Sequence, residues 1–288
     1  MNTSLSLRVV VLGVGLLVAA CDSAKVGTLD QIKKSGEIRL GYRTDAPPLS
    51  FNDATGQAAG YSVELCKRIA AAVKDHLQLK ELKTTLVPLT SENRIDAIVN
   101  NRADILCGAT TITLSRSEKV DFTLMTFVTG GGFLTLANSG IDSLASLAGK
   151  SVAVVTGTTS QTALQQYLQK NLIDAKVVVV ADRSEGMKQL QARKVDAFAS
   201  DQIVLIGEIL SASDPRAYSL GVDLFSFEPY ALAVRRNDAD FRLVVNRAIA
   251  QVYRSGQIED VFNRWFGQVG VQATPVLRTM YLLQTLPE

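Results

Sequence analysis

The chain has 288 residues, of which 47% are hydrophobic and 20% charged, which is a globular composition at a length typical of about two domains. Lys and Arg together number 30 and Asp and Glu 28, and this near balance argues against a dedicated nucleic-acid-binding protein. His76 is the only histidine, so a histidine-based zinc site is excluded and a Ser-His-Asp triad would have to use His76 itself. Three cysteines are too few for a four-cysteine metal site. We therefore expect neither a metal ion nor a cofactor.

Residues 1–20 have the pattern of an export signal. Arg8 precedes an uncharged run of 12 residues, Val9–Ala20, which is too short to span a bilayer but has the length of a signal-peptide core. The Val-Ala-Ala sequence before Cys21 resembles a bacterial lipobox, which implies cleavage before Cys21 and a lipid on its thiol. Plain secretion without a lipid is the alternative. Either way the mature protein is predicted to lie outside the cytoplasm, with residues 21–35 as an N-terminal tether and membrane contact only through the lipid.

In chain order, the first half alternates short apolar segments with amphipathic ones, as in an α/β fold. Glu37–Tyr42 alternates with period two and is predicted to be a strand. In Tyr61–Leu77 the apolar residues recur at three- and four-residue spacing, which predicts a helix with one buried face. The further predicted elements are a strand over Thr84–Leu89, a helix from a Ser91 cap through Asn101, and a strand over Asp104–Cys107.

The second half repeats this scheme. Its predicted strands are Ser151–Val155, Lys176–Val180 and Asp196–Ala199, and its predicted helices are Ser160–Leu172 and Ser184–Arg193. Segments beginning at Ser91 and Ser184 share the order Ser-Glu, amphipathic helix, basic residue, Asp and strand, which suggests two similar lobes.

A flexible crossing between the lobes is predicted over Phe127–Leu136, where Gly130–Gly132 supply a backbone that can bend. A second crossing is expected near Ser226–Ala233. The chain would then return to the first lobe and finish it with a helix over Asp240–Ser255 and the segment Ile258–Phe266.

After export, Cys66 and Cys107 would lie in an oxidising compartment, where disulfides form and persist. Cys66 lies on a predicted helix and Cys107 on a predicted strand that could pack beneath it. A disulfide and a pair of buried free thiols are both compatible with the sequence.

Several segments, in order, resemble the amino-acid-binding proteins of ABC importers, most closely their glutamate/aspartate branch. They are GYRTDAPPLSF (41–51), GYSVELCKRIA (60–70), LTSENRI (89–95), CGATTIT (107–113), LAGKSVAVVTGTTS (147–160) and SGQIEDVFNRWFG (255–267). The resemblance implies an α/β fold of the type II periplasmic-binding-protein (Venus-flytrap) class, in which two lobes joined by a two-strand hinge close over one ligand. Lobe 1 would comprise residues 36–128 and 229–288, and lobe 2 residues 129–228. It also implies a monomer in the periplasm or cell envelope that docks on an ABC permease in the inner membrane.

By this resemblance, one part of the cleft would hold the backbone groups of an amino acid. Arg116 would bind the α-carboxylate through two parallel hydrogen bonds, a bidentate geometry that lysine cannot form. Asp201 would accept the α-ammonium. The carboxylate cage would be completed by the N–H groups near Ala109, Thr110 and Thr111 and by Thr158 and Thr159 at a helix N-terminus. The structural alternatives are an ion pair of Arg116 with Glu118 or Asp121, and helix-capping roles for Thr158, Thr159 and Asp201.

The other part of the cleft would select the ligand side chain through Arg43, Ser91 and Arg94. Two arginines in one pocket favour an anion over a neutral group, so we expect an acidic amino acid. The alternatives are an ion pair of Arg43 with Asp45 and a solvated Arg94. The sequence departs from the branch at two positions: Ala109 replaces the usual serine and removes a hydroxyl donor, and Arg183 replaces a histidine and adds a positive charge.

The expected function is therefore that of a non-enzymatic binding protein that delivers glutamate or aspartate to a permease, with open lobes that close over the ligand. One alternative is an enzyme on the same fold, such as a cyclohexadienyl dehydratase, which needs a catalytic carboxylate in the cleft. Asp201 is already assigned to the ammonium, which argues against it. The other alternative is a ligand-sensing subunit that docks on a receptor.

Overall fold

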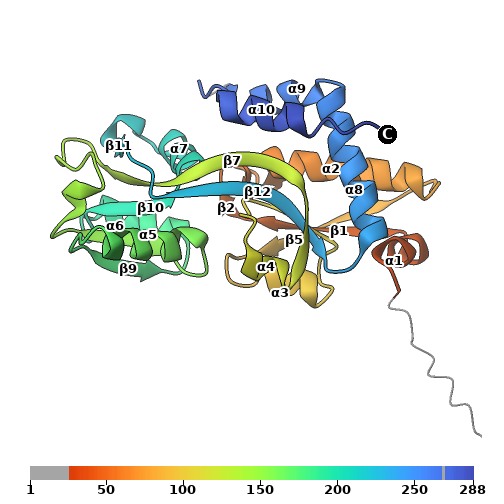
Figure 1. Ribbon diagram of the computed structural model, residues 1–288, viewed down its shortest axis with the longest axis horizontal. Coiled ribbons are helices and arrows are strands. Elements are labelled where there is room, and N and C mark those ends of the chain that lie inside the picture. Colours follow the sequence, from red (N-terminus) through yellow and green to blue (C-terminus); the bar gives the residue numbers. More distant parts are fainter. Residues whose placement is uncertain (1–25, 268–269) are drawn as a thin grey trace, which may run out of the picture.

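The computed structural model describes residues 26–267 and 270–288, so the predicted signal peptide and Cys21 lie outside the described residues. Two α/β lobes lie side by side and are joined by two long strands (Figure 1). The predicted two-lobed fold with a two-strand hinge is confirmed. Within the described ranges, no helix has both the length and the apolar character needed to cross a membrane.

Lobe 1 is built around three parallel strands with the order β5-β1-β6, flanked by helices and a small three-stranded sheet. The helix predicted over Tyr61–Leu77 is present as α2, and its face with Val63, Ile69 and Val73 is buried, as the spacing of the apolar residues predicts. The elements are α1 (Thr28–Ser35), β1 (Glu37–Arg43), β2 (Asp45–Ala46), β3 (Ser50–Asn52), β4 (Ala58–Ala59), α2 (Tyr61–His76), β5 (Lys83–Leu89), α3 (Arg94–Val99), β6 (Ile105–Cys107) and α4 (Leu114–Ser117).

Lobe 2 repeats the arrangement with the parallel strands β10-β8-β9. Its elements are the short 3-10 helix Ala145–Leu147, β8 (Ser151–Val155), α5 (Thr159–Lys170), β9 (Lys176–Val180), α6 (Arg183–Gln191), β10 (Ala197–Asp201), α7 (Gln202–Ser211), the 3-10 helix Pro215–Ala217 and β11 (Tyr218–Leu220). After the second crossing the chain returns to lobe 1 as α8 (Ala239–Arg254), α9 (Gln257–Trp265) and α10 (Pro275–Leu283).

The crossing strands are β7 (Val120–Leu136) and β12 (Ser226–Arg235), which pair with each other in antiparallel fashion. They link the strands of both lobes into one continuous sheet, and the predicted lobe boundaries at residues 128 and 229 fall within them. The hinge glycines also serve close packing, because a Cβ on Gly131 would come within 2.4 Å of the Phe225 ring.

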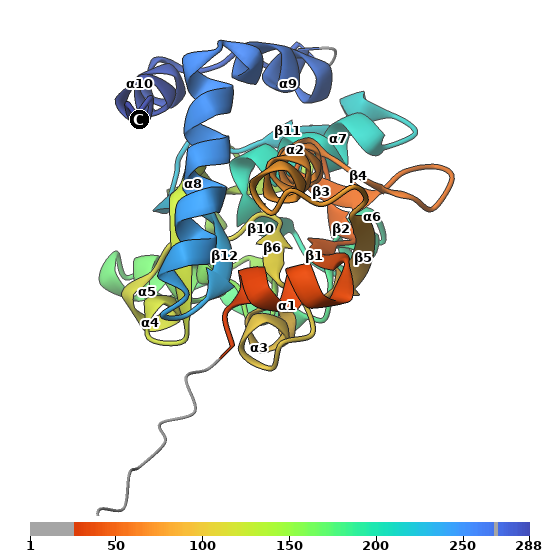
Figure 2. The same cartoon turned by 90° about the vertical axis from the view of Figure 1, so that its right-hand side faces the viewer.

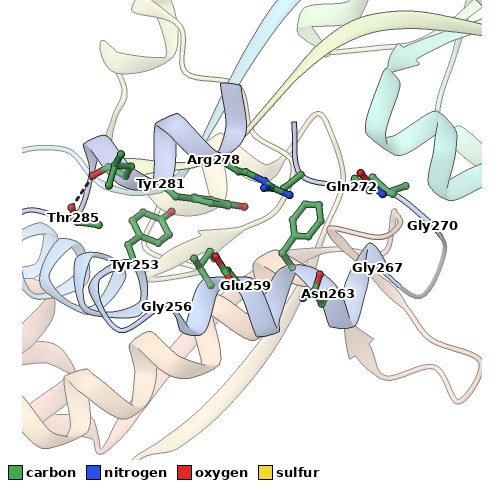
Figure 3. A pocket seen from close by; sticks show the side chains of 15 residues that line it. Tyr253, Gly256, Glu259, Asn263, Gly267, Gly270, Gln272, Arg278, Tyr281 and Thr285 are labelled. Atoms are coloured by element: carbon green, nitrogen blue, oxygen red, sulfur yellow. Dashed lines mark hydrogen bonds between the residues drawn. The ribbon is translucent and has the colours of Figure 1, made fainter. Parts of the chain in front are cut away.

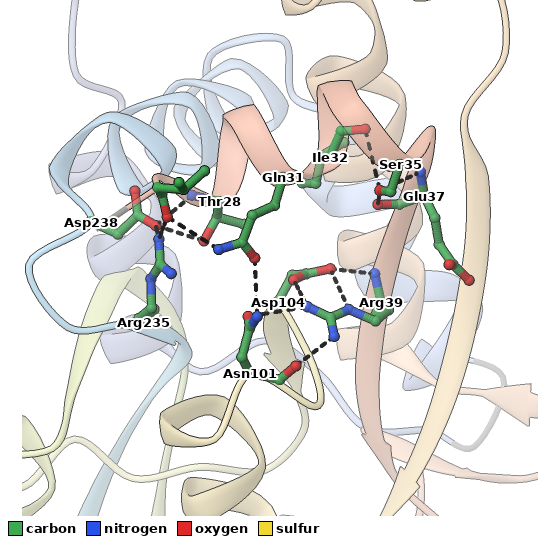
Figure 4. A network of polar contacts seen from close by, with 11 residues as sticks. Thr28, Gln31, Ile32, Ser35, Glu37, Arg39, Asn101, Asp104, Arg235 and Asp238 are labelled. Carbon is green, nitrogen blue, oxygen red and sulfur yellow. Dashed lines mark hydrogen bonds and ion pairs between the residues drawn. The ribbon is translucent and has the colours of Figure 1, made fainter. Parts of the chain in front are cut away.

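Part of the predicted tether is structured. Helix α1 is fastened at its start, where the Thr28 N–H and hydroxyl donate to the Asp238 carboxylate at 2.9 and 2.6 Å (Figure 4). The same carboxylate forms an ion pair with Arg235 at 2.7 Å. Ile32 of α1 is buried in the core of lobe 1. Only the residues before α1 therefore remain a predicted tether.

Lobe 1 is held together by a disulfide and by a C-terminal helix. A disulfide joins Cys66 of α2 to Cys107 of β6. Helix α10, which no pattern in the sequence predicted, contacts α8 and β7, and it lies on the opposite side of the end of α8 from α9 (Figure 2). Its Tyr281 hydroxyl lies 2.9 Å from that of Tyr61, and Gln284, just after it, accepts a 2.7 Å bond from the Met125 N–H of β7. The C-terminal helix thus braces the hinge strand.

Candidate functional site

The two lobes meet across a closed cleft, at which side chains of one lobe contact the other directly. The contacts are Arg183 Nη1 to Asp45 Oδ1 at 3.4 Å, Arg94 Nη2 to the Gly157 carbonyl at 3.4 Å, and Thr111 Oγ1 to Thr159 Oγ1 at 3.2 Å. The predicted site residues therefore come together from β1, α3 and the loop after β6 on one side, and from the N-termini of α5 and α6 and the end of β10 on the other.

Three arginines converge in this cleft and are almost entirely buried. Arg43 ends β1, Arg94 begins α3 and Arg183 begins α6, and they are 1%, 2% and 2% exposed. Among the described residues, none of their three buried Nε–H groups has a hydrogen-bond partner. Unpaired buried donors are costly, so this end of the cleft is suited to an anionic ligand.

The positive charges of these arginines also repel one another. Burial, followed by the charge of Arg183, lowers the pKa of Arg43 to about 10. Burial lowers the pKa of Arg94 well below its usual value, and Arg116 and Arg43 lower it further. An added carboxylate would relieve this repulsion. Arg43 also has its structural partner, since its Nη2 lies 2.6 Å from the Asp45 carboxylate.

Ser91 is buried beside these arginines, but its predicted capping role is wrong. Helix α3 begins at Arg94, after a turn in which Thr90 and Asn93 bond to each other. The Thr90 N–H donates to Asn93 Oδ1 at 2.9 Å, and the Asn93 N–H donates to Thr90 Oγ1 at 3.2 Å. Ser91 contributes its carbonyl, which accepts from Arg94 Nη1. The sequence signal was ambiguous because two hydroxyl residues lie side by side before the helix.

Arg116, whose charge also acts on Arg94, lies on α4 and donates from Nη1 to the Thr111 carbonyl at 2.8 Å. Neither Glu118 nor Asp121 forms an ion pair with it among the described contacts. A cavity of about 500 Å³ opens beside it; its lining includes Thr111, Arg116, Thr158, Thr159 and Glu228. Burial lowers the pKa of the Arg116 guanidinium.

The cleft threonines differ in how far their hydroxyl groups are already hydrogen-bonded within the protein. Thr158 caps α5, since its Oγ1 accepts from the Gln161 N–H at 3.2 Å and donates to the Val155 carbonyl at 2.7 Å. Thr159, the first residue of α5, donates its hydroxyl to Glu228 at 2.8 Å. Thr110 is buried with an Oγ1 that has no partner in the described part of the chain, and neighbouring Ala109 packs in the lobe 1 core.

Asp201 lies at the end of β10 with both carboxylate oxygens facing neutral donors. The Ser160 hydroxyl donates to Oδ1 at 2.7 Å, and the Tyr230 hydroxyl donates to Oδ2. Although Asp201 precedes α7, its side chain does not cap that helix. Among the described residues Asp201 forms no ion pair, an arrangement that can accommodate a cation in the cleft.

Glu228 is a cleft residue that the sequence analysis missed. It lies on the crossing strand β12, is 1% exposed and accepts hydroxyl bonds from Thr111, Thr159 and Ser226. Burial, with a contribution from Asp201, raises the pKa of its carboxyl. The signal that could have marked it is an acidic residue close before the largely apolar run at residues 230–234 of the same strand.

A second cavity, of about 660 Å³, lies between α8, α9 and α10, and none of the cleft arginines lines it (Figure 3). Its charged lining residues, Glu259 and Arg278, are both exposed, so a charge bound there would stay in contact with water. The converging buried charges belong to the inter-lobe cleft instead. No cluster of His, Cys, Asp or Glu able to hold a metal ion is present in residues 26–267 and 270–288.

Two hinged lobes with buried charged groups converging between them define a solute-binding protein. Residues 38–268 match the family of bacterial extracellular solute-binding proteins, family 3, and the chain belongs to that family. An L-glutamate/L-aspartate-binding protein of Pseudomonas aeruginosa is 35% identical over 259 residues, which cover 88% of this chain and 86% of the relative. A glutamate/aspartate import solute-binding protein of Escherichia coli is 32% identical, with 87% and 83% covered.

Among solved structures, an ancestral amino-acid-binding protein described as a precursor of cyclohexadienyl dehydratase is similar, with a TM-score of 0.72 and 28% sequence identity. The match covers 83% of this chain and 99% of that one.

Proposed function

We propose that this chain is the extracytoplasmic binding component of an ABC amino-acid importer and that its ligand is L-glutamate or L-aspartate. The observation that carries the proposal is the set of three buried Nε–H donors on Arg43, Arg94 and Arg183 for which the described residues supply no hydrogen-bond partner. A side-chain carboxylate would accept from such donors and offset their mutual repulsion. The names of the two relatives above, both glutamate/aspartate-binding proteins, support the same ligand class.

The rest of the ligand would be held by groups that match a zwitterion. Arg116 would bind the α-carboxylate, assisted by Thr110, Thr111 and the N-terminus of α5 at Thr159. Asp201 would bind the α-ammonium. Each ligand charge would then face an opposite, largely desolvated charge of the protein, which favours specificity as well as affinity.

Transport would follow from ligand-dependent closure. Capture by the open form is followed by approach of the second lobe, and the permease would recognise the closed form. Export, with cleavage before Cys21 and a lipid on that residue, would keep the protein at the membrane surface beside the permease.

Thermal unfolding of the ligand-stripped mature protein against the common amino acids tests the proposal. A ligand at a thousandfold excess over its Kd stabilises the folded state by about 4 kcal/mol. For a chain of this size, that corresponds to an increase in Tm of roughly 8–16 °C. We expect this increase with glutamate or aspartate and a much smaller one with glutamine. An increase with arginine or with neutral amino acids alone would contradict the acidic specificity.

One observation favours an enzyme as a second candidate. Glu228 is a buried cleft carboxyl whose pKa is raised, a property suited to a general acid, and one structural relative is described as a precursor of a dehydratase. Incubation with a cyclohexadienyl substrate would give an aromatic product if the chain were such an enzyme, and E228Q would abolish the formation of that product. The absence of product with the native chain would leave the binding function alone.

A further inference from the structure

Asp45 links the two lobes through a single carboxylate oxygen. Its Oδ1 lies 2.6 Å from Arg43 Nη2 within lobe 1 and 3.4 Å from Arg183 Nη1 on lobe 2. Both guanidiniums are buried, with side chains 2% and 3% exposed, whereas the Asp45 side chain is 20% exposed at the rim. One carboxylate is therefore shared by two of the three buried arginines of the cleft.

The surrounding charges keep Asp45 ionised. Burial alone would raise its pKa, but the guanidiniums of Arg183 and Arg43 together lower it below the usual value. In return, Asp45 contributes to the raised pKa of Arg183, against the effect of burial. Glu208 on α7 also faces this group, and burial raises its pKa to about 7, so it carries less than a full charge near neutrality. Asp201 also acts to raise the pKa of Arg43 and of Arg183, but less than Asp45 does, so Asp45 is the principal fixed anion beside these two guanidiniums.

Asp45 is not needed to build the strand that carries it. It belongs to the two-residue strand β2, whose pairing with Phe51 uses backbone groups. The only hydrogen bonds of its side chain among the described residues are those to Arg43 and Arg183. Its carboxylate therefore serves the charge of the cleft and the contact between lobes, and the isosteric amide would leave the strand intact.

We propose that Asp45 is a specificity-determining residue that cancels one guanidinium charge and so adapts the cleft to a side chain with a single negative charge. The proposal rests on the proposed function, because it assumes an acidic amino acid in this cleft. A ligand with a doubly charged side chain would bring its second charge towards Asp45 and be disfavoured by repulsion. Removal of the carboxylate would leave three arginines with one more uncompensated charge, which a dianionic group would neutralise better.

The test compares L-glutamate with O-phospho-L-serine, whose phosphate is close to doubly charged at neutral pH. Isothermal titration of the mature protein and of D45N gives the Kd ratio of phosphoserine to glutamate for each. We expect that ratio to fall by roughly tenfold or more in D45N, a change that corresponds to about 1.4 kcal/mol. D96N, which removes one exposed charge from the same lobe, is the matched control and should keep the ratio of the native protein.

A ratio in D45N within about twofold of the native value would overturn the role of Asp45, since tenfold is the change expected from one charge. If D45N does not fold, R183Q provides the opposite change: it leaves Asp45 with one cation fewer and should raise the ratio. An unchanged ratio in R183Q would overturn the proposal as well. Failure of the native protein to bind either ligand would contradict the proposed function itself, which separates the two results.

Discussion

Asp201 is hydrogen-bonded by neutral groups, although its charge also acts on all four arginines of the cleft. Both of its oxygens accept from hydroxyl groups, those of Ser160 and Tyr230, so its negative charge is hydrogen-bonded but is not neutralised by an ion pair in the described structure. The buried Tyr230 hydroxyl has a pKa raised well above its usual value, first by burial and then by Asp201, and therefore stays a donor. We propose that this carboxylate receives the ammonium of the ligand.

The first prediction concerns that cation. In D201N the α-ammonium of glutamate loses its counter-charge, and loss of one partner of a buried ion pair costs about 3–5 kcal/mol, or more than a hundredfold in Kd. Glutarate, which has both carboxylates and no ammonium, should bind the native protein and D201N with similar affinity. Isothermal titration of both ligands measures this, and equal losses for the two would contradict the role of Asp201.

The second prediction concerns Glu208, whose pKa is raised from 4.5 to about 7, chiefly by burial, although Arg183 acts in the opposite direction. Because the folded state holds this proton more tightly than the unfolded state, the contribution is fully present below the unfolded pKa. It is lost as the pH rises through about 7. At about 1.4 kcal/mol per pKa unit, the free energy of unfolding should fall by up to about 3 kcal/mol.

Urea unfolding of the ligand-free protein at several pH values measures this decrease. The E208Q variant cannot ionise at this position and should show a flatter profile between about pH 5 and pH 8. Identical profiles for the native chain and E208Q would assign the pH dependence to other groups.

At the same scale, the residues that the sequence could identify are those within contiguous motifs. Arg94 and Arg116 were predicted because their loops and helices resemble a known family, and the structure brings both to the cleft. Glu228 and Asp45 were not assigned to the site because their roles depend on contacts between distant segments. Glu228 faces threonines of both lobes, and Asp45 meets the N-terminus of α6, which is 138 residues away.

At the scale of elements, helix α7 fits lobe 1 only because it contains Gly207. A Cβ at that position would lie 2.2 Å from the Pro47 carbonyl oxygen of the opposite lobe, so the closed arrangement excludes any larger residue without movement. Alanine is otherwise favoured over glycine inside a helix by roughly 0.5–1 kcal/mol. The same substitution should therefore affect closure and helix stability in opposite directions.

The third prediction is that G207A binds glutamate at least about tenfold more weakly, the effect of about 1.4 kcal/mol lost from closure, while the Tm of the ligand-free protein is unchanged or higher. Small-angle scattering should show that the variant stays more extended at saturating ligand. G27A, outside the hinge and the cleft, is the control, since its Cβ would make only ordinary contacts, the nearest at 3.6 Å to Asp30. Native affinity in G207A would show that closure does not use this contact.

The elements with a clear period were predictable, and those defined by tertiary contacts were not. Strand Glu37–Arg43 and helix Tyr61–His76 were predicted within one residue at each end, because alternation and helical spacing mark a buried face. Helix α1 was taken for part of a tether, since it is short and mostly polar and is fixed by Asp238. Strand β7 extends well beyond the predicted crossing because it pairs with β12 in both lobes.

At the scale of the whole molecule, the lobes are held together by the two crossing strands and by a few contacts across the cleft. Several of these contacts are long or shared, including the 3.4 Å Asp45–Arg183 pair and the 3.4 Å Arg94–Gly157 bond. Burial and mutual repulsion lower the pKa of Arg43 and of Arg94, so their charges also oppose closure of an empty cleft. An anionic ligand would remove that penalty, which couples its charge to the closure of the lobes.

The most direct measurement of this central claim is isothermal titration of the ligand-stripped mature protein with L-glutamate, L-glutamine and glutarate. Glutamine removes the side-chain charge that the three arginines would bind, and glutarate removes the ammonium that Asp201 would bind. We predict that L-glutamate binds at least about a hundredfold more tightly than either, a difference of about 2.8 kcal/mol. Equal affinity for glutamate and glutamine would contradict the claim that the buried arginines select an acidic side chain.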